Sequence, residues 1–424
     1  MAEIMPFRAL RFCASAGPLS ELVCPPYSSI REEQRRMLLE KNPHNIVRLE
    51  LGEKPYSNVK ETLLEWKNSG VLKQDSTPGI YLYEDEFLIH GQVKKRKGIL
   101  CLIKIEDYEK SVILPREDTF SKNRIDRFEL LKATSCQFSP IHCVYQDKER
   151  EILNRVETLS GFKPRFIFTE GEVTRRLWLV NDPVAIRAFY DDFADKQLLI
   201  AEGHHRYEAA LQLRNWYREE GISKEGDESD YILTALTDME SDGLTLLPTY
   251  RLLRGLPNFN AEKLLSDCQT YFDVIERDSI SEIESNLDAL YRQGKTAFAY
   301  YGGGESWSLL ILKDFSVMQT LLPEKSQAFQ NSDVSVLHSL ILERMLGIDS
   351  ENAAQQINLA YTEQFEAAIS SVREGSNQCV FFMNPPRIKE VREIAEAGER
   401  MMQASARFYP QPVAGLVMNQ IQES

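Results

Sequence analysis

One short turn, residues 202–206, constrains the fold of this chain more than any other stretch. Before it, residues 198–201 form an apolar run typical of a buried strand. After it, apolar residues recur up to Tyr217 at the spacing of one buried face of a helix. Gly203 lies where one pattern gives way to the other. The sequence therefore predicts a buried strand, a tight polar turn and a helix that begins at Gly203.

The composition of this turn is that of an anion site. In order, it holds Glu202, Gly203, His204, His205 and Arg206. A helix start exposes about four backbone N–H groups and the positive end of the helix dipole. Glycine lets a ligand approach the backbone closely, and an arginine side chain donates two parallel hydrogen bonds to a phosphate. We therefore interpret the turn as a phosphate site, and a nucleotide is a common source of that phosphate.

Two alternatives concern the histidines. Histidines at a helix start are often only caps or surface groups, and the turn alone does not exclude this. A metal site that uses both His204 and His205 is disfavoured, because adjacent helical side chains point about 100° apart. No third ligand is evident nearby in the sequence.

Length and charge limit the class of protein. The chain has 424 residues, 43% of them hydrophobic, which is enough for two or three domains with separate cores. With 64 acidic and 50 basic residues, its net charge of −14 argues against broad binding to nucleic acid or membranes, although a local basic cleft is compatible with it. Seven cysteines without a CxxC motif indicate reduced thiols and a cytoplasmic protein. The first residues lack a signal-peptide core, and no apolar run approaches the ~18 residues of a membrane span.

Strand and helix patterns alternate along the chain, which indicates a mixed α/β (α+β) fold. Strands are expected at residues 7–12, 45–51, 79–88, 97–105, 164–169, 231–237, 244–247, 296–301, 306–312 and 379–383. Helices are expected at residues 30–41, 57–73, 151–161, 183–193, 260–270, 279–293, 333–345, 363–373 and 387–400. Asp182 and Asp333 are the expected caps of the helices that follow them.

Three further features are interpreted as structural. The basic run 94–97 is expected at the exposed end of a hairpin. The three glycines 302–304 are expected to form a plain turn and not a phosphate loop, because no GKS or GKT sequence follows them. His338, on the apolar side of its helix, is interpreted as a core histidine and not a ligand.

Residues 114–127 carry more charge than a connecting loop needs. Arg116, Glu117 and Lys122 are among these charges. One interpretation is a solvated loop followed by an amphipathic helix. The other is a catalytic loop that brings carboxylates and basic groups to a phosphate. Because ordering so many charges without a ligand is costly, we expect this loop to pack near the turn at 202–206.

Motifs along nearly the whole chain resemble a bacterial and archaeal family known as domain of unknown function 1015. They are MPFRALRF at the start, VCPPY at 23–27, NPHNIVRLEL at 42–51, LPREDTFSK at 114–122, LLKAT at 130–134, SPI at 139–141, LLIAEGHHRYEAAL at 198–211, LLPTYRLL at 246–253, DVSVLHSLILERMLGI at 333–348 and RFYPQPVAGLVM at 407–418. The family is defined by sequence and not by activity, so this resemblance implies no reaction.

The chain departs from the family pattern at a few positions. Glu202 replaces the usual aspartate of the turn, and Arg116 and Tyr250 stand where histidines are expected. The stretch 401–406 lacks the usual lysine and threonine. If those positions contact phosphate, this member has altered or lost activity.

The GHHRYEA turn is also similar, more remotely, to the nucleotide-binding turn of the ParB/sulfiredoxin superfamily. Its members include ParB partition proteins, sulfiredoxin and kinases that phosphorylate free serine. The resemblance implies that Gly203, His204, His205 and Arg206 hold the phosphates of ATP or ADP, with His205 donating to the transferring group. It also implies that Glu202 or Glu117 binds Mg²⁺ or acts as a base, and that Lys122 supplies positive charge.

These observations together predict three regions and one activity. The regions are an N-terminal α/β region at 1–150, a ParB/sulfiredoxin-like nucleotide-binding core at 151–256 and a C-terminal α/β region at 257–424. The predicted activity is phosphoryl transfer to a small hydroxyl-bearing metabolite, with free serine as the specific expectation by analogy. A non-catalytic nucleotide sensor and a ParB-like DNA-binding protein are the alternatives, and the acidic charge counts against the latter. The sequence leaves a homo-oligomer open.

Overall fold

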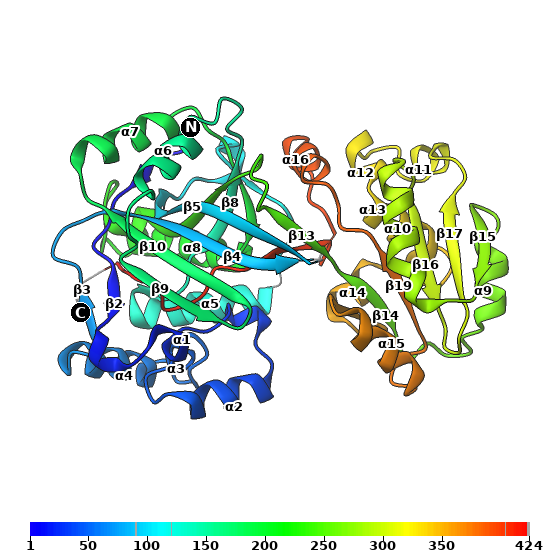
Figure 1. The fold of residues 1–424 in the computed structure, drawn as a ribbon, viewed down its shortest axis with the longest axis horizontal. Coiled ribbons are helices and arrows are strands. Elements are labelled where there is room, and N and C mark those ends of the chain that lie inside the picture. The colour runs from blue at the N-terminus through cyan, green and yellow to red at the C-terminus, as the bar shows by residue number, and fades with distance from the viewer. Residues whose placement is uncertain (90, 120, 403, 422–424) are drawn as a thin grey trace. The chain divides into compact units, whose positions relative to one another are not determined.

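The computed structural model describes residues 1–89, 91–119, 121–402 and 404–421. Phe120 of the charged loop and Gln403 of the 401–406 stretch lie outside the described residues. The fold is mixed α/β, as predicted, and the chain forms two compact units (Figure 1). Unit 1 consists of Met1–Pro115, Thr119–Thr245 and Phe408–Ser424, and unit 2 consists of Arg116–Asp118 and Leu246–Arg407.

This division differs from the three regions expected at 1–150, 151–256 and 257–424. Strands from both sides of residue 150 pair within one sheet, so the first two regions belong to one unit. Unit 2 begins at Leu246, and the end of the chain returns to unit 1. Local sequence patterns do not encode these long-range strand pairings, which explains why the division into units differs from the regions expected from the sequence.

A nine-stranded sheet forms the centre of unit 1. Its order is β6 (Ile113–Pro115), β11 (Leu198–Glu202), β8 (Ile141–Tyr145), β12 (Tyr231–Asp238), β5 (Gln92–Lys104), β4 (Ile80–Ile89), β10 (Val173–Val180) and β9 (Phe166–Glu170), with β1 (Ile4–Met5) paired to β5. Strand β11 runs parallel to β6 and antiparallel to β8. The polar turn at 202–206 therefore follows a strand that is paired on both sides.

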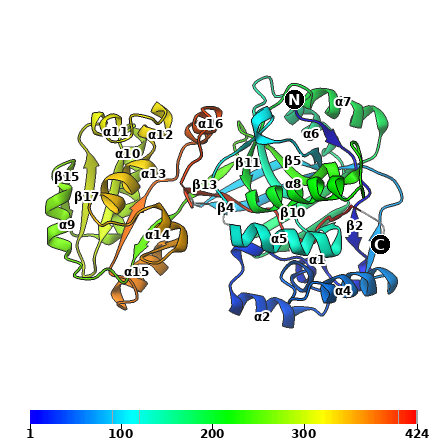
Figure 2. The same cartoon turned by 180° about the vertical axis from the view of Figure 1, so that it is seen from behind.

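Four helices cover one face of this sheet: α5 (Ser121–Thr134), α6 (Glu151–Leu159), α7 (Pro183–Phe193) and α8 (His204–Glu219). Their apolar sides pack on inward residues such as Ile99, Ile141 and Ile200. Figure 2 shows α5 and α8 side by side on that face. The N- and C-terminal segments cover the other face through residues such as Phe7 and Val417.

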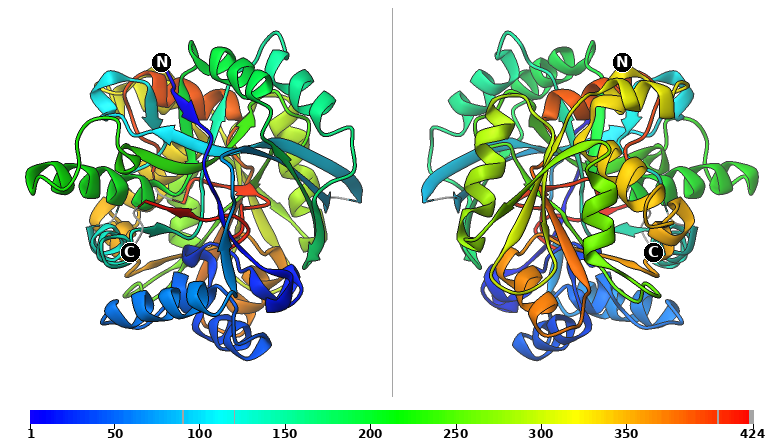
Figure 3. Two further views of the ribbon diagram at one scale, coloured as in Figure 1. Left: turned by 90° about the vertical axis from the view of Figure 1, so that its left-hand side faces the viewer. Right: turned by 90° about the vertical axis from the view of Figure 1, so that its right-hand side faces the viewer.

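The N-terminal elements build a smaller core on one side of unit 1, seen in blue in Figure 3. They are β2 (Leu10–Phe12), α1 (Leu19–Leu22), α2 (Glu32–Lys41), α3 (Val47–Glu50), α4 (Ser57–Asn68) and β3 (Leu72–Gln74). The short strands β7 (Cys136–Gln137) and β21 (Asn419–Gln420) pair with each other and hold the end of the chain.

Unit 2 is a six-stranded sheet with helices on both faces (Figure 3, right). Its order is β15 (Phe272–Arg277), β17 (Trp307–Leu312), β16 (Ala297–Tyr301), β19 (Cys379–Met383), β14 (Tyr250–Leu253) and β18 (Leu359–Thr362). One face packs on α10 (Ile283–Arg292) and α15 (Phe365–Arg373), and the other packs on α9 (Ala261–Cys268), α11 (Ser316–Leu321), α13 (Asp333–Val336) and the π-helix Leu337–Glu343. Apart from short 3₁₀ helices, the remaining elements are α12 (Gln327–Asn331), α14 (Ser350–Gln355), α16 (Ile388–Glu396), β13 (Thr245–Pro248) and β20 (Ala406–Tyr409).

Two predictions about strands were wrong. Residues 45–51 were expected to form a strand but contain the helical turn α3, because Asn45 Oδ1 accepts a hydrogen bond from Val47 N at 2.9 Å and starts the turn. The basic run 94–97 lies inside β5 and not at a hairpin end. Its side chains pair with acidic residues of β4: Lys95 with Glu86, Arg96 with Asp85, and Lys97 with Glu84.

Other local predictions are confirmed. The strand at 198–201 and the helix that follows Gly203 are β11 and α8. Asp182 caps α7 by accepting a hydrogen bond from Ala185 N at 2.9 Å. The glycines 302–304 join β16 and β17. The cap predicted at Asp333 was wrong, because Asp333 is the first residue of that helix and Ser332 is its cap residue. Within the described ranges, no helix combines the length and apolar character that a membrane crossing requires.

Candidate functional site

The turn after β11 places Gly203 in the left-handed conformation, with φ 97° and ψ 25°. Helix α8 begins at the next residue, and Arg206 N donates to the Gly203 carbonyl at 2.9 Å. A side chain at position 203 would also be crowded: an added Cβ would lie 2.9 Å from both Arg206 Nη2 and Ile141 Cγ2. Glycine is thus required here both by the backbone and by the close approach of the Arg206 guanidinium.

Replacing Gly203 by alanine is expected to lower the free energy of unfolding by about 2–4 kcal/mol, since the positive φ and the crowding each cost about 1–2 kcal/mol. Urea denaturation of the full chain measures this loss. The control is Gly221→Ala, because Gly221 also has a positive φ of 68° but an added Cβ meets nothing within 4 Å. Equal losses in the two variants would contradict a role for crowding at position 203.

Arg206 spans the helix start and the interior of unit 1. Its Nη1 donates to Ser139 Oγ at 2.8 Å and to the Pro140 carbonyl. Its Nε is buried and has no acceptor among the described residues, and none of them accepts from Nη2. Nε and Nη2 form the side-on edge of a guanidinium, which is an arrangement that binds a phosphate or carboxylate through two parallel bonds. Nη1 of Arg206 therefore makes the hydrogen bonds within the described residues, and the edge formed by Nε and Nη2 is available to an anion.

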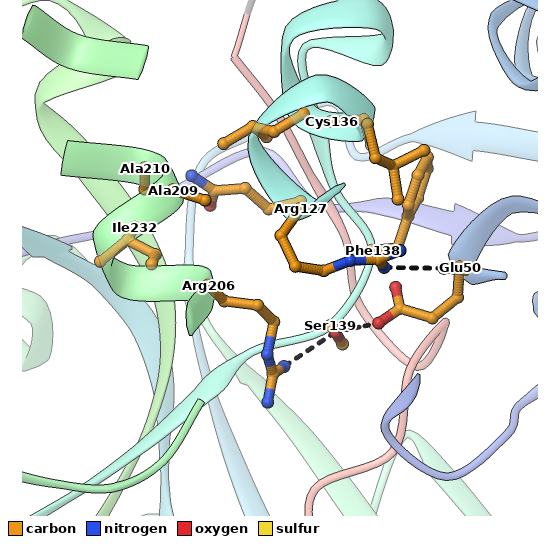
Figure 4. A pocket seen from close by; sticks show the side chains of 12 residues that line it. Glu50, Arg127, Cys136, Phe138, Ser139, Arg206, Ala209, Ala210 and Ile232 are labelled. Carbon is orange, nitrogen blue, oxygen red and sulfur yellow. Dashed lines mark hydrogen bonds between the residues drawn. The ribbon is translucent and has the colours of Figure 1, made fainter. Parts of the chain in front are cut away.

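A hydrogen-bonded network connects Arg206 to Ser139 and Glu50 (Figure 4). Ser139 Oγ, which accepts from Arg206, donates to Glu50 Oε1 at 2.9 Å. Arg127 Nη1 donates to the Glu50 carbonyl at 2.8 Å, and the Arg127 guanidinium lies 4.3 Å from the Tyr27 ring centroid. These side chains come from five segments that are far apart in the sequence, and together they fix the guanidinium of Arg206.

The two histidines of the turn lie in different surroundings. His204 is buried and His205 is partly buried. Burial lowers the pKa of His205 from its usual value, and Arg206 and Arg124 lower it further, whereas Glu208 raises it. His205 is therefore neutral near pH 7, and a neutral imidazole still donates one N–H hydrogen bond. This agrees chemically with the donor role expected for His205.

Glu202 ends β11 beside the turn and is partly buried. Its Oε1 accepts a hydrogen bond from Phe408 N at 3.2 Å. In the described part of the chain, no group of three or more His, Cys, Asp or Glu side chains is arranged to hold a metal ion by itself. Mg²⁺ on a nucleotide takes most of its ligands from phosphate and water and needs only one or two carboxylates. Glu202 fits such a role and remains the candidate ligand.

Residues of the charged loop 114–127 belong to both units: Arg116–Asp118 to unit 2 and the others to unit 1. Thr119 Oγ1 donates to the Glu208 carboxylate, and Arg124 Nη1 lies 3.4 Å from the same carboxylate, so the later part of the loop packs on α8 as expected. Lys122 is exposed in the first turn of α5. Glu117 belongs to unit 2, so its catalytic role stays a prediction.

In unit 2, Arg116 and Glu117 bind the 401–406 stretch. Arg116 Nη1 donates to Ser405 Oγ at 3.3 Å and to the Ala406 carbonyl at 3.0 Å, and its Nη2 donates to Glu117 Oε1 at 3.1 Å. Tyr250, another departure from the family pattern, donates its hydroxyl to Glu284 Oε1 at 3.2 Å. Arg116, Tyr250 and Ser405 thus make structural contacts inside unit 2.

Sequence reasoning did not select Tyr27, Glu50 or Ser139, and it counted Arg127 only among the charges of a loop. Each of the first three lies in a motif that carries the family resemblance: VCPPY, NPHNIVRLEL and SPI. The motifs were therefore a usable signal for their importance. What the sequence does not contain is the tertiary contact that brings these residues to Arg206.

A family model described as "Protein of unknown function (DUF1015)" matches residues 4–340. No curated protein matches the chain. Similar solved structures include a conserved hypothetical protein from Pyrococcus furiosus (16% identity, TM-score 0.36, 74% of this chain and 94% of that chain). They also include a free serine kinase in complex with AMP (16% identity, TM-score 0.39, 74% and 90%) and SbnI with a C-terminal truncation from Staphylococcus aureus (9% identity, TM-score 0.37, 77% and 90%). TM-scores this low assign no activity to the chain, and the likeness to ParB and sulfiredoxin stays a prediction.

Proposed function

This chain belongs to the DUF1015 family of proteins of unknown function, and we propose that it is a nucleotide-dependent phosphotransferase with its phosphate site at the start of α8. The observation that carries the proposal is the unused side-on edge of Arg206. Its Nη2 lies 2.9 Å from the position of a Cβ on Gly203, so this edge reaches the helix start. A helix start and a guanidinium edge together favour a phosphate group over other ligands.

Each residue of the turn then has a role. Backbone N–H groups of Gly203, His204 and His205 hold phosphate oxygens together with Nε and Nη2 of Arg206. His205 donates a hydrogen bond to the transferring group. Glu202 holds Mg²⁺, which neutralises charge on the phosphates of ATP or ADP when it is bound.

The remaining expected residues complete the reaction. Glu117, or Glu202 in its place, takes the proton of the acceptor hydroxyl, and Lys122 supplies positive charge. The acceptor oxygen attacks the terminal phosphorus while the bond to the leaving phosphate breaks. Such transfer depends mostly on positioning and electrostatics, so a preorganised turn with one or two carboxylates can support it. The acceptor is a small hydroxyl-bearing metabolite, with free serine as the first compound to test.

Arg206→Ala is expected to weaken nucleotide binding by about 1.5–3 kcal/mol, the scale of hydrogen bonds to charged groups. Calorimetric titration with ATP, ADP, CTP and GTP in the presence of Mg²⁺ measures this, after a thermal-shift screen. A nucleotide at about 100 times its dissociation constant should stabilise wild type by about 2.7 kcal/mol. Because Arg206 also binds Ser139, Ser139→Ala is the control for loss of the structural hydrogen bonds that Ser139 makes to Arg206 and Glu50. Failure of wild type to bind any nucleotide would reject the proposal.

Nucleotide affinity is expected to rise as the pH falls through the pKa that His205 has in the nucleotide complex. Burial lowers the pKa of His205 in the free protein, and a bound phosphate would raise it again, so binding takes up a proton between the two pKa values. The gain is at most about tenfold per pH unit. His205→Gln should remove this component, while titration of the nucleotide's own phosphate affects both proteins equally. Identical pH profiles for the two proteins would separate His205 from the phosphate site.

A nucleotide sensor without catalysis is the second candidate. It is favoured by the departures from the family pattern at Arg116, Tyr250 and 401–406, which serve structural contacts in this chain. Nucleotide binding without turnover of any acceptor would support the sensor over the phosphotransferase.

A further inference from the structure

A cavity of about 50 Å³ lies beneath the start of α8, and the roles proposed above leave it unused. Its polar end is formed by Glu50, Arg127, Ser139 and Arg206 (Figure 4). Its apolar wall includes Leu130, Leu131, Ala209, Ala210 and Ile232. A water-sized group needs about 10–15 Å³, so the cavity has room for about three to five non-hydrogen atoms. It is too small for a nucleotide and large enough for the end of a small metabolite.

The buried carboxylate in this cavity has unused capacity for hydrogen bonds. Glu50 is 3% exposed. Among the described residues, Ser139 donates to its Oε1, and no lysine, arginine or histidine forms an ion pair with it. Arg127 binds the backbone carbonyl of Glu50 and directs its ion pair to Asp126 at 2.6 Å instead. A carboxylate can accept several hydrogen bonds, and burial with few of them is costly. A donor from a ligand would satisfy it.

Arg206 connects this cavity with the proposed phosphate site. Its guanidinium lines the cavity, and its Nη2 reaches the helix start beside Gly203. A group that enters the cavity therefore lies next to the same guanidinium that holds the phosphate. This is the relation required between an acceptor oxygen and the phosphoryl group that it receives.

The charges around the cavity select its ligand. Arg127 is already paired with Asp126, so Glu50 and Arg206 leave the cavity close to neutral. An added carboxylate end would be repelled by Glu50, and an added ammonium end would be repelled by Arg206. A neutral hydroxyl avoids both penalties and can donate to Glu50. The apolar wall suits the methylene group that carries such a hydroxyl.

We infer that this cavity binds the hydroxyl end of the phosphoryl acceptor, and that the acceptor is a small primary alcohol. Before transfer, Glu50 accepts the hydrogen bond of the hydroxyl and orients its oxygen towards the phosphate, while the leucine and alanine side chains contact the CH₂ group. Rotation about the C–O bond then turns the single hydroxyl proton to the general base as the oxygen–phosphorus bond forms. Ser139 fixes the Glu50 carboxylate in place. This inference rests on the proposed function, since it names the second substrate of the same site.

The test fills the cavity without touching the phosphate site. Ala210→Leu adds three carbon atoms to a wall residue that is 3% exposed. Binding of L-serine, ethanolamine and glycerol to the full chain is measured by NMR saturation transfer with ADP and Mg²⁺ present, and binding of ADP is measured separately by calorimetry. At least one of these alcohols should bind wild type. Its affinity for Ala210→Leu should be about tenfold or more lower, because the leucine side chain occupies the space of the ligand. The affinity for ADP should change less than about twofold.

Two further variants keep the test decisive if Ala210→Leu folds poorly. Glu50→Gln removes the charge but keeps the size of the side chain and an oxygen that can still accept from Ser139, so the network that holds Arg206 should persist. Alcohol binding should therefore fall much more than ADP binding. Ala235→Leu is the matched control, because it adds the same atoms beside a separate cavity of about 20 Å³. It should leave alcohol binding unchanged.

The outcomes separate this inference from the proposed function. If ADP binds wild type but no alcohol does, or if alcohols bind wild type, Ala210→Leu and Glu50→Gln equally, the cavity is not the acceptor site and the nucleotide site stands. If none of ATP, ADP, CTP and GTP binds wild type, the proposed function fails, and the inference fails with it.

Discussion

Replacing Asp85 by alanine is expected to lower the free energy of unfolding by about 3–5 kcal/mol, because it leaves the buried guanidinium of Arg96 without its counter-charge and that of Arg175 with only Glu170, at 3.6 Å. Asp85 of β4 lies between Arg96 of β5 and Arg175 of β10 in the strand register. Its Oδ2 accepts from Arg96 Nη2 at 2.6 Å, and its Oδ1 accepts from Arg175 Nη1 at 2.8 Å. The three side chains are only 4%, 0% and 6% exposed.

The two arginines also hold the end of the chain. Arg96 Nη2 donates to the Pro410 carbonyl, and Arg175 Nη2 donates to the Gln411 carbonyl at 3.1 Å. Nearby in the same segment, Phe408 N donates to Glu202. Loss of Asp85 should therefore loosen residues 408–411 as well as the sheet, and hydrogen exchange of these amides should accelerate in Asp85→Ala.

Urea denaturation of the full chain measures the loss, and Glu86→Ala is the matched control. Glu86 lies on the same strand and also pairs with two basic side chains, Lys95 at 3.1 Å and Arg176 at 3.2 Å. It is 29% exposed, and water screens such surface pairs, so its loss should cost about 1 kcal/mol or less. A loss for Asp85→Ala no larger than that for Glu86→Ala would contradict the assigned role of the buried triad.

This triad shows where sequence analysis reaches its limit. The run Lys94–Lys95–Arg96–Lys97 has the composition of an exposed hairpin end, and nothing local distinguishes Arg96 from its neighbours. Arg96 is nevertheless 0% exposed. Its burial depends on the partner strand, which supplies Asp85, and on the end of the chain, which covers it. A pairing between residues 314 positions apart has no local signature.

Where interactions between residues close in sequence determine the structure, the sequence predicted it. The strand, glycine and helix at 198–217 were predicted because each depends on a nearby pattern: an apolar run, a positive φ and a 3.6-residue period. His338 was predicted as a core histidine and is 5% exposed, and burial lowers its pKa to about 3. The strand predicted at 45–51 was wrong because apolar content alone did not reveal the turn that Asn45 nucleates.

One part of the candidate site could likewise be predicted from the sequence, and the other part could not. Its phosphate-binding turn is contiguous in sequence and could be proposed from five residues. The support beneath it, Glu50 and Ser139, could not, because each is an ordinary polar residue until the fold brings it to Arg206. A functional site that is assembled from distant segments is visible in sequence only as a set of unexplained motifs.

Glu117→Gln is expected to reduce phosphoryl transfer by about 100-fold or more if Glu117 is the general base. Glutamine keeps the size of the side chain and an oxygen that can still accept from Arg116 Nη2, which lies 3.1 Å from Glu117 Oε1 in wild type. The structure of unit 2 should therefore persist, and only the negative charge is lost. Nucleotide binding should remain, because the phosphates are assigned to the turn at 203–206.

Glu202→Gln is the matched comparison and decides between the two carboxylates. Its side-chain oxygen can still accept from Phe408 N, so the local fold should also persist. If Glu202 holds Mg²⁺ and Glu117 is the base, Glu202→Gln raises the Mg²⁺ concentration required for half-maximal activity, whereas Glu117→Gln lowers kcat at every Mg²⁺ concentration. Phosphorus NMR with ATP or ADP, Mg²⁺ and a panel of hydroxyl amino acids follows both. If Glu117→Gln transfers phosphate as fast as wild type and only Glu202→Gln is impaired, Glu202 is the base as well. If wild type binds nucleotide yet forms no phosphorylated product with any acceptor, the chain is a nucleotide sensor and neither carboxylate has a catalytic role.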